Sequence, residues 1–186
     1  MTNGYALNVL SADRPGIVAG VSKTIARLNG NIESCSQTVV SGFFTLIMIV
    51  TFPESMEESE LKQHLTDTEE LLGCQIIVQK VTEAHFWQKP QNTNNFVITA
   101  FGQDRHDIVS GFCQYLAGRE INIVDLYGDK TDNNEFVLIC QVEVNVDDDI
   151  QVIQYDLEEL GQELGFTVKI QHNNVFVATN QIRLDY

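Results

Sequence analysis

The sequence repeats itself, and this feature constrains the fold more than any other. When Asp13-Arg14 is laid on Asp104-Arg105, residues of the same type coincide at many positions along both halves. One inserted residue extends the alignment as far as Gly73 and Gly165. A repeat of this length indicates one supersecondary unit that occurs twice. We therefore predict domain 1 over residues 1–85, domain 2 over residues 95–186, and a polar linker over residues 86–94.

The spacing of hydrophobic residues changes in the same order within each half. A period of two predicts strands, and a period near 3.6 predicts helices. Ser41-Gly42 and the polar segment 131–134 are typical of hairpin turns. In the first half, strands are predicted at 5–9, 32–40, 43–52 and 75–81, and helices at 17–28 and after 55. In the second half, strands are predicted at 96–100, from Asn122, at 135–144 and at 166–170, and helices at 108–116 and 150–164.

Short polar segments mark where these helices begin and end. Ser55-Met56-Glu57-Glu58 predicts a capping box, and Asp147 predicts a cap for the corresponding helix of the second half. Gly73 and Gly165 stand where a left-handed residue would end each helix. The tail residues 175–178 predict one more short strand.

The predicted fold class is therefore α+β. Each half reads βαββαβ, the ferredoxin-like order, in which two helices cover one face of a four-stranded antiparallel sheet.

The charge of the chain limits its partners. Eleven basic residues against 26 acidic residues give a net charge of −15. Because duplex affinity depends on Lys and Arg replacing counterions, we expect no direct binding to nucleic acid. The acidic surface also argues against membranes and favours basic protein surfaces as partners. A polar N-terminus without a long apolar run favours a cytoplasmic location.

No group of residues points to catalysis, to a metal or to another cofactor. The four cysteines lack the spacing of zinc ligands, and we interpret them as buried free thiols. Asp147-Asp148-Asp149 lacks the alternation of calcium loops, so helix capping explains it better. His85-Phe86-Trp87 favours a seal between domains over a ligand patch. Since no nucleophile stands beside a base, we expect a protein that is not an enzyme.

The segment from Ser11 to Ile17 is the best candidate for a binding site. Pro15 presets the turn, Gly16 leaves the backbone accessible, and the N–H groups of the first helical turn attract a carboxylate. Asn31 offers an amide at the start of the next strand. The alternative is that these residues are purely structural. Asp13 would then cap the helix, Pro15 and Gly16 would set the backbone geometry of the helix start, and Asn31 would form a turn.

These residues resemble the ACT domains, which pair a D-R-P-G type loop, here residues 13–16, with an Asn-Ile pair, here residues 31–32. The resemblance occurs once in each half, so the two matches together cover nearly the whole chain. A tandem pair of such domains without a catalytic domain is similar to the glycine cleavage system transcriptional repressors. It implies an amino-acid ligand at an interface between paired units and a regulated protein partner. The positions implied as ligand-binding are Ser11, Asp13, Arg14, Gly16, Ile17 and Asn31.

The second half departs from this pattern, because His106 and Asp107 replace Pro15 and Gly16. A carboxylate at Asp107 would stand where a ligand carboxylate would bind, so we expect this loop not to bind an amino acid in that way. His106 is interpreted as an exposed residue of the capping region, with a pH-sensitive or ligand-contacting role as the alternative.

Three hypotheses follow. The first is a regulatory homodimer that senses an amino acid and acts on a protein partner, such as a transcription activator. The second is an assembly module without a ligand, whose units pair through sheet edges and helix faces. The third is a detached regulatory subunit of an amino-acid or folate enzyme.

Overall fold

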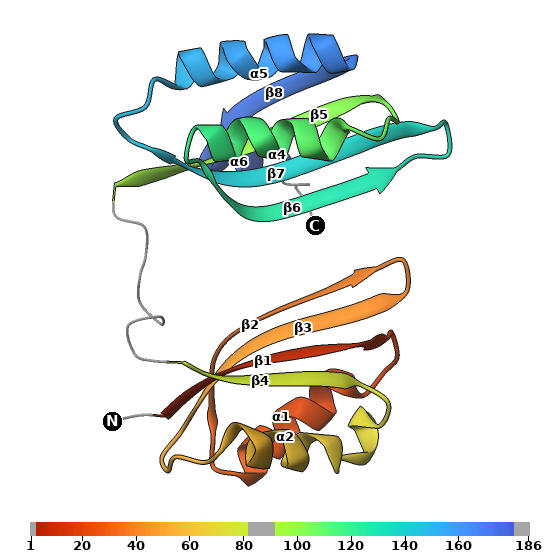
Figure 1. Cartoon of the computed structure of the whole chain (residues 1–186), viewed down its shortest axis with the longest axis vertical. Helices are drawn as coiled ribbons and strands as arrows, with labels where there is room; N and C mark the ends of the chain where they lie inside the picture. Colours follow the sequence, from red (N-terminus) through yellow and green to blue (C-terminus); the bar gives the residue numbers. More distant parts are fainter. Residues whose placement is uncertain (1–2, 82–91, 181–186) are drawn as a thin grey trace, which may run out of the picture. The chain divides into compact units, whose positions relative to one another are not determined.

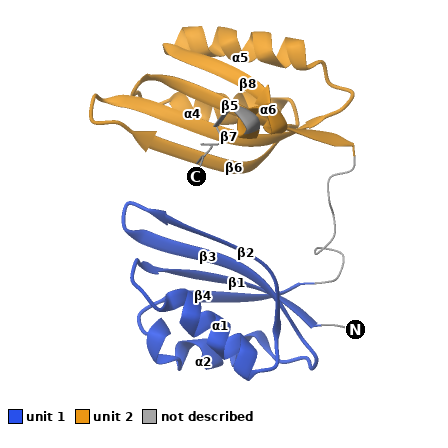
Figure 2. Cartoon of the chain, turned by 180° about the vertical axis from the view of Figure 1, so that it is seen from behind, with its two compact units in different colours: residues 1–89 blue, residues 90–186 orange. Residues whose placement is uncertain are grey.

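The computed structural model describes residues 3–81 and 92–180, which form two compact units (Figures 1 and 2). Unit 1 spans Met1–Lys89, and unit 2 spans Pro90–Tyr186. His85-Phe86-Trp87 and most of the predicted linker lie outside the described residues. The first strand of unit 2 begins at Thr93, so it includes the last residues of that predicted linker.

Unit 1 has the predicted order of elements. Its elements are β1 (Asn3–Ala12), α1 (Ile17–Arg27), β2 (Asn31–Val40), β3 (Phe43–Phe52), α2 (Glu58–Thr66), the 3₁₀ turn η1 (Glu69–Leu71) and β4 (Gln75–Val81).

Unit 2 repeats this order and adds one helix. Its elements are β5 (Thr93–Gln103), α4 (Ile108–Gly118), β6 (Asn122–Lys130), β7 (Glu135–Asn145), α5 (Ile150–Leu164), β8 (Phe166–His172) and α6 (Asn173–Asn180). The prediction of a strand at 175–178 is wrong, because these residues belong to α6. This helix contacts β5 and β8 and lies on the opposite side of the sheet from α4 (Figures 1 and 2).

Each unit contains one antiparallel sheet, with the order β2-β3-β1-β4 in unit 1 and β6-β7-β5-β8 in unit 2. Figure 1 shows α1 and α2 over one face of the first sheet, and α4 and α5 over one face of the second. The predicted pair of ferredoxin-like units is therefore confirmed. In both sheets an edge is formed by the strand that follows the first helix.

The cores lie between the helices and the sheets, and strand alternation decides which residues enter them. Alternate side chains of a strand point to opposite faces, so one face of each sheet supplies the core and the other does not. In unit 1 the core combines Tyr5, Leu7, Val9, Leu46, Met48 and Val50 of the sheet with Ile17, Val21, Ile25, Leu61 and Leu65 of the helices.

The turns agree with the sequence better than the helix caps do. Ser41 and Gly42 both have positive φ, as a tight hairpin requires. Gly165, with φ 75°, ends α5 as predicted, whereas Gly73, with φ 80°, does not end α2, whose C-cap is Asp67. The predicted capping box is wrong, because Glu57 is the N-cap of α2 without a capping side chain. The Glu58 carboxylate instead accepts a 2.7 Å hydrogen bond from the Lys80 backbone N–H.

Two further sequence-based expectations need correction. The cap of α5 is Asp149 and not Asp147, since its carboxylate accepts from the Gln151 N–H at 2.9 Å. All four cysteines are free thiols, but only Cys140 is buried, and Cys35 is exposed on the edge strand β2. Burial raises the pKa of the Cys140 thiol to about 11.

Candidate functional site

The loop between β1 and α1 is held at both ends by the rest of unit 1. The Asp13 N–H donates to Gly42 O at 2.9 Å, which ties the loop to the β2–β3 turn. On the other side, the Arg14 guanidinium donates to the backbone O of Leu72 at 2.6 Å. Leu72 directly follows η1. The loop therefore has a defined position before any ligand binds.

The start of α1 is open. Gly16 is the N-cap residue, with φ 101° in the left-handed region, and no side chain caps the helix. Residues with a side chain rarely adopt this conformation, which explains the glycine. The structural alternative is therefore wrong in assigning the cap of α1 to Asp13. Its exposed side chain makes no hydrogen bond or ion pair within the described residues. The first N–H groups of α1 remain available to an anion.

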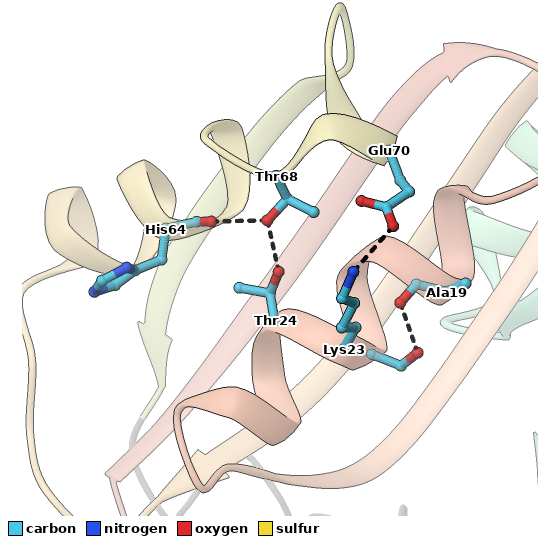
Figure 3. Close-up of polar contacts among 7 residues, drawn as sticks. Ala19, Lys23, Thr24, His64, Thr68 and Glu70 are labelled. Carbon is cyan, nitrogen blue, oxygen red and sulfur yellow. Dashed lines mark hydrogen bonds and ion pairs between the residues drawn. The ribbon is translucent and has the colours of Figure 1, made fainter.

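A carboxylate that the sequence did not reveal lies beside this opening. Glu70 packs so close to the loop that its Cγ lies 3.9 Å from where a Cβ on Gly16 would be. It also pairs with Lys23 at 3.3 Å (Figure 3). Its own backbone N–H and Lys23 keep the pKa of Glu70 below its usual value, so the carboxylate is ionised at neutral pH. Its position depends on η1 packing against α1, which no local motif encodes.

The six predicted positions do not converge on one point. Ser11, Asp13, Arg14 and Gly16 belong to the loop and its entrance, but the Ile17 side chain is only 1% exposed and belongs to the core. Arg14 is turned toward Leu72 O, and its Nη1 is buried without a hydrogen-bond partner in the described part of the chain. Ile17 and Arg14 thus position the loop.

Asn31 lies at the far end of the same sheet. Asn31 pairs with Thr51 on β3, whereas Ala12, at the entrance of the loop, pairs with Phe43. Eight residues along a strand correspond to about 27 Å. Within one unit, therefore, Asn31 cannot contact anything bound at Gly16. Its amide donates to Glu33 at 3.0 Å.

The corresponding loop of unit 2 keeps the same two anchors. The Asp104 N–H donates to Asn134 O at 3.0 Å, and Arg105 donates to Leu164 O at 3.4 Å. The repeated Arg thus has a structural explanation in both units, whereas the repeated Asp contributes only its backbone N–H to this anchor.

The charges in this second loop are paired with one another. Asp107 lies at the N-cap of α4 but does not cap it, because both of its oxygens accept from Arg105, at 2.8 and 2.9 Å. Arg105 accordingly lowers the pKa of Asp107. Asp104 pairs with Lys130 at 2.7 Å. His106 is exposed.

Comparison with known proteins identifies this arrangement. The ACT domain family matches residues 6–79 and 94–171, one match for each unit. The chain belongs to the ACT domain family. A stretch of the chain about the length of one unit also resembles curated UPF0237 proteins. A UPF0237 protein of Methanopyrus kandleri is 43% identical over 74 residues, covering 39% of this chain and 82% of that protein. One from Listeria innocua is 41% identical over 75 residues, covering 40% and 84%.

Two solved structures share the fold of this tandem ACT protein over nearly the whole chain. An unknown protein from Galdieria sulphuraria has a TM-score of 0.79 at 21% identity, covering 92% of this chain and 99% of that one. A candidate glycine cleavage system transcriptional repressor has a TM-score of 0.64 at 18% identity, covering 93% and 99%. At these identities the likeness concerns the fold.

The described residues give two further findings. None of their helices is long and apolar enough to cross a membrane. They also contain no cluster of three or more His, Cys, Asp or Glu side chains that could hold a metal ion, and this includes Asp147-Asp148-Asp149.

Proposed function

We propose that this ACT protein is a non-catalytic regulator that binds an amino acid at the α1 opening of unit 1 and transmits that binding to a protein partner. The observation that carries the proposal is the contrast between the two loops. Neither α1 nor α4 has a side-chain cap, but the N-cap residue is Gly16 in unit 1 and Asp107 in unit 2, whose carboxylate pairs with Arg105 and adds a negative charge beside the helix start.

The charges around the opening suit a zwitterion. The free N–H groups of α1 attract a carboxylate through the positive end of the helix dipole. Asp13 and Glu70 offer two carboxylates for an α-ammonium group. A simple anion would gain the first contact but would be repelled by these side chains, which favours an amino acid over an inorganic ion.

A complete site would require two copies of unit 1. β2 is an edge strand with one charged side chain, Glu33, and its open edge can accept another strand. If two β2 strands pair antiparallel over their full length, Asn31 of one copy lies beside Val40 of the other. Val40 precedes the turn that accepts the Asp13 N–H. This pairing would bring the Asn31 amide toward the opposite loop, which Asn31 cannot reach within its own unit.

Amino-acid binding can be tested by thermal unfolding of the full chain in the presence of each of the twenty amino acids. A ligand that binds only the native state increases the free energy of unfolding, by about 2.7 kcal/mol when its concentration is a hundred times Kd. The melting temperature rises as a result. We expect a shift with one amino acid or a few. No shift with any of them would favour an assembly module without a ligand.

Asn31→Ala and Asn122→Ala form a matched pair for this experiment. Each removes one exposed amide that donates to a glutamate, at 3.0 Å in unit 1 and 2.9 Å in unit 2. We expect the ligand shift to disappear in Asn31→Ala and to persist in Asn122→Ala. Equal shifts in both variants would exclude Asn31 from the site. Replacing Gly16 is less informative, because its φ of 101° makes any side chain strained.

The protein partner in this proposal has a basic surface and contacts unit 2, and a transcription activator of the glycine cleavage type fits this description. Most of the acidic residues lie beyond residue 90, including Glu158, Glu159 and Glu163 on α5. Such binding should weaken as salt rises, because exposed charges are screened over about 10 Å at 0.1 M. Retention of native partners on the immobilised chain at low and high salt tests this. Salt-sensitive binding of the chain itself to duplex DNA would contradict it.

A further inference from the structure

The sheet of unit 1 has one face that its helices do not cover, defined here as the free face. Register assigns to it alternate residues of all four strands. Its larger apolar side chains are strongly exposed: Phe43 and Ile77 to 63%, Val40 to 60%, Ile47 to 51% and Leu10 to 40%. The remaining positions are mainly Ser, Thr, Asn, Gln and Ala.

The free face carries no ionisable residue at any of its register positions. One carboxylate reaches its corner, where Glu33 accepts hydrogen bonds from Thr51 at 2.7 Å and from Asn31 at 3.0 Å. In a chain of which 20% is charged, an exposed sheet face without charge at its centre is unusual. Large exposed apolar patches mark interaction surfaces.

The repeat supplies an internal control for this observation. The same face of the unit 2 sheet carries charges where unit 1 has none. Ser34, Thr38, Phe43, Thr51 and Ile77 of unit 1 correspond by register to Asp125, Asp129, Glu135, Glu143 and Lys169 of unit 2. Moreover, α6 contacts β5 and β8, and Val97, which β5 directs to that face, is only 4% exposed. The fold therefore accepts charges on this face, and unit 1 lacks them.

We propose that the free face of unit 1 is the docking surface for the same face of a second copy of this chain. This proposal does not depend on an amino-acid ligand, and it uses the sheet face and not the β2 edge. Two chains that each carry −15 repel one another over most of their surface. The uncharged face is where they can approach without bringing like charges into contact, whereas a basic partner would be drawn to unit 2.

The area of the face is sufficient for this. Four strands about 4.8 Å apart and nine residues at about 3.3 Å each span about 20 by 30 Å. Protruding side chains increase the accessible area beyond that plane, toward the roughly 800 Å² per partner of a standard interface. Two such faces would pack as aligned sheets, about 10 Å apart.

Two substitutions copied from unit 2, Phe43→Glu and Ile77→Lys, test the proposal. Leu72→Lys is the matched control, because Leu72 is 62% exposed but lies outside the strands. The mass of the full chain is measured by sedimentation equilibrium at micromolar concentrations, and circular dichroism verifies that each variant is folded. We expect Phe43→Glu and Ile77→Lys to halve the mass or to weaken association at least tenfold. Leu72→Lys should leave it unchanged.

Salt provides a second measurement on the unmodified chain. Association through an uncharged face should strengthen when salt is raised roughly tenfold, because the repulsion between acidic chains is screened. A monomeric wild-type chain would overturn the proposal. Association that weakens with salt, or that the control variant disrupts as strongly as Ile77→Lys, would also overturn it.

Discussion

The two units share one topology but differ wherever a surface is available for binding. Unit 1 has an open helix N-terminus at Gly16 and an uncharged free face. Unit 2 has a loop in which Arg105 neutralises Asp107, charged residues on the corresponding face, and α6 packed on that sheet. Because the fold tolerates either set of side chains, the differences are not demanded by stability. The proposed ligand site and docking surface of unit 1, and the proposed partner contact of unit 2, rest on these differences.

The helix layers also differ, and this difference concerns stability. In unit 1 the second helix ends at Thr66 and is followed by η1, whereas α5 of unit 2 continues to Leu164. The longer helix is possible because Gly161 lets it lie directly on β8. A Cβ there would approach Val168 Cγ2 to 2.4 Å and Phe166 O to 2.9 Å.

The largest effect that we expect in this comparison is therefore from Gly161→Ala. Overpacking against the backbone costs about 1–3 kcal/mol. Hydrogen–deuterium exchange of the full chain should show faster exchange in α5 and β8, while the amides of unit 1 are unchanged and serve as an internal reference. Equal acceleration in both units would show that they do not unfold independently.

Gly118→Ala is the control for this substitution. It also replaces a helical glycine of unit 2, but no atom lies within 4 Å of the added Cβ. Helix propensity favours alanine by up to about 1 kcal/mol, so we expect exchange in unit 2 to stay the same or to slow. Faster exchange in Gly118→Ala would mean that close approach at Gly161 is not the cause.

The fold could be predicted from the sequence because its determinants are local. The change of hydrophobic period identified the strands, and turn residues such as Ser41-Gly42 and Gly165 fixed their limits. The errors lie where a polar residue has more than one possible partner. Glu58 was expected in a capping box, yet it binds the Lys80 N–H of a strand distant in the sequence. A strand is predicted for the α6 segment because its apolar residues form a run of four, 175–178, which is too short to distinguish a strand from a helix.

The candidate site was less predictable, because it depends on distances between elements. The loop motif located Gly16 and the helix opening, but it could not show that Asn31 lies at the other end of the sheet. Nor could it reveal Glu70, which reaches the opening only because η1 packs on α1. The free face required the register of four strands, since its residues are scattered through the first 81 positions.

The polar contacts that the first helix of each unit makes also differ: α1 contacts the segment between α2 and η1, whereas α4 contacts α5. In unit 1 the contact is buried and uncharged: Thr24 and Thr68 hydroxyls lie 2.7 Å apart, and Thr68 donates to His64 O (Figure 3). In unit 2 the equivalent contact is charged. The Tyr115 hydroxyl donates to Asp156 at 3.1 Å, and Arg119 also pairs with Asp156.

This difference predicts the smallest effect. Of the two contacts, only the one in unit 2 should make the free energy of unfolding depend on alkaline pH. Partial burial and the bond to Asp156 raise the pKa of Tyr115 to about 12. The unfolded chain releases this proton near pH 10, whereas the folded unit retains it. The contribution of Tyr115 is therefore complete below pH 10 and is lost as pH rises toward 12. Tyr115→Phe should make the free energy of unfolding of the full chain, measured with denaturant, less dependent on pH across that window, by no more than the slope of one proton. An unchanged slope would show that the folded state does not hold the Tyr115 proton more tightly than the unfolded chain does.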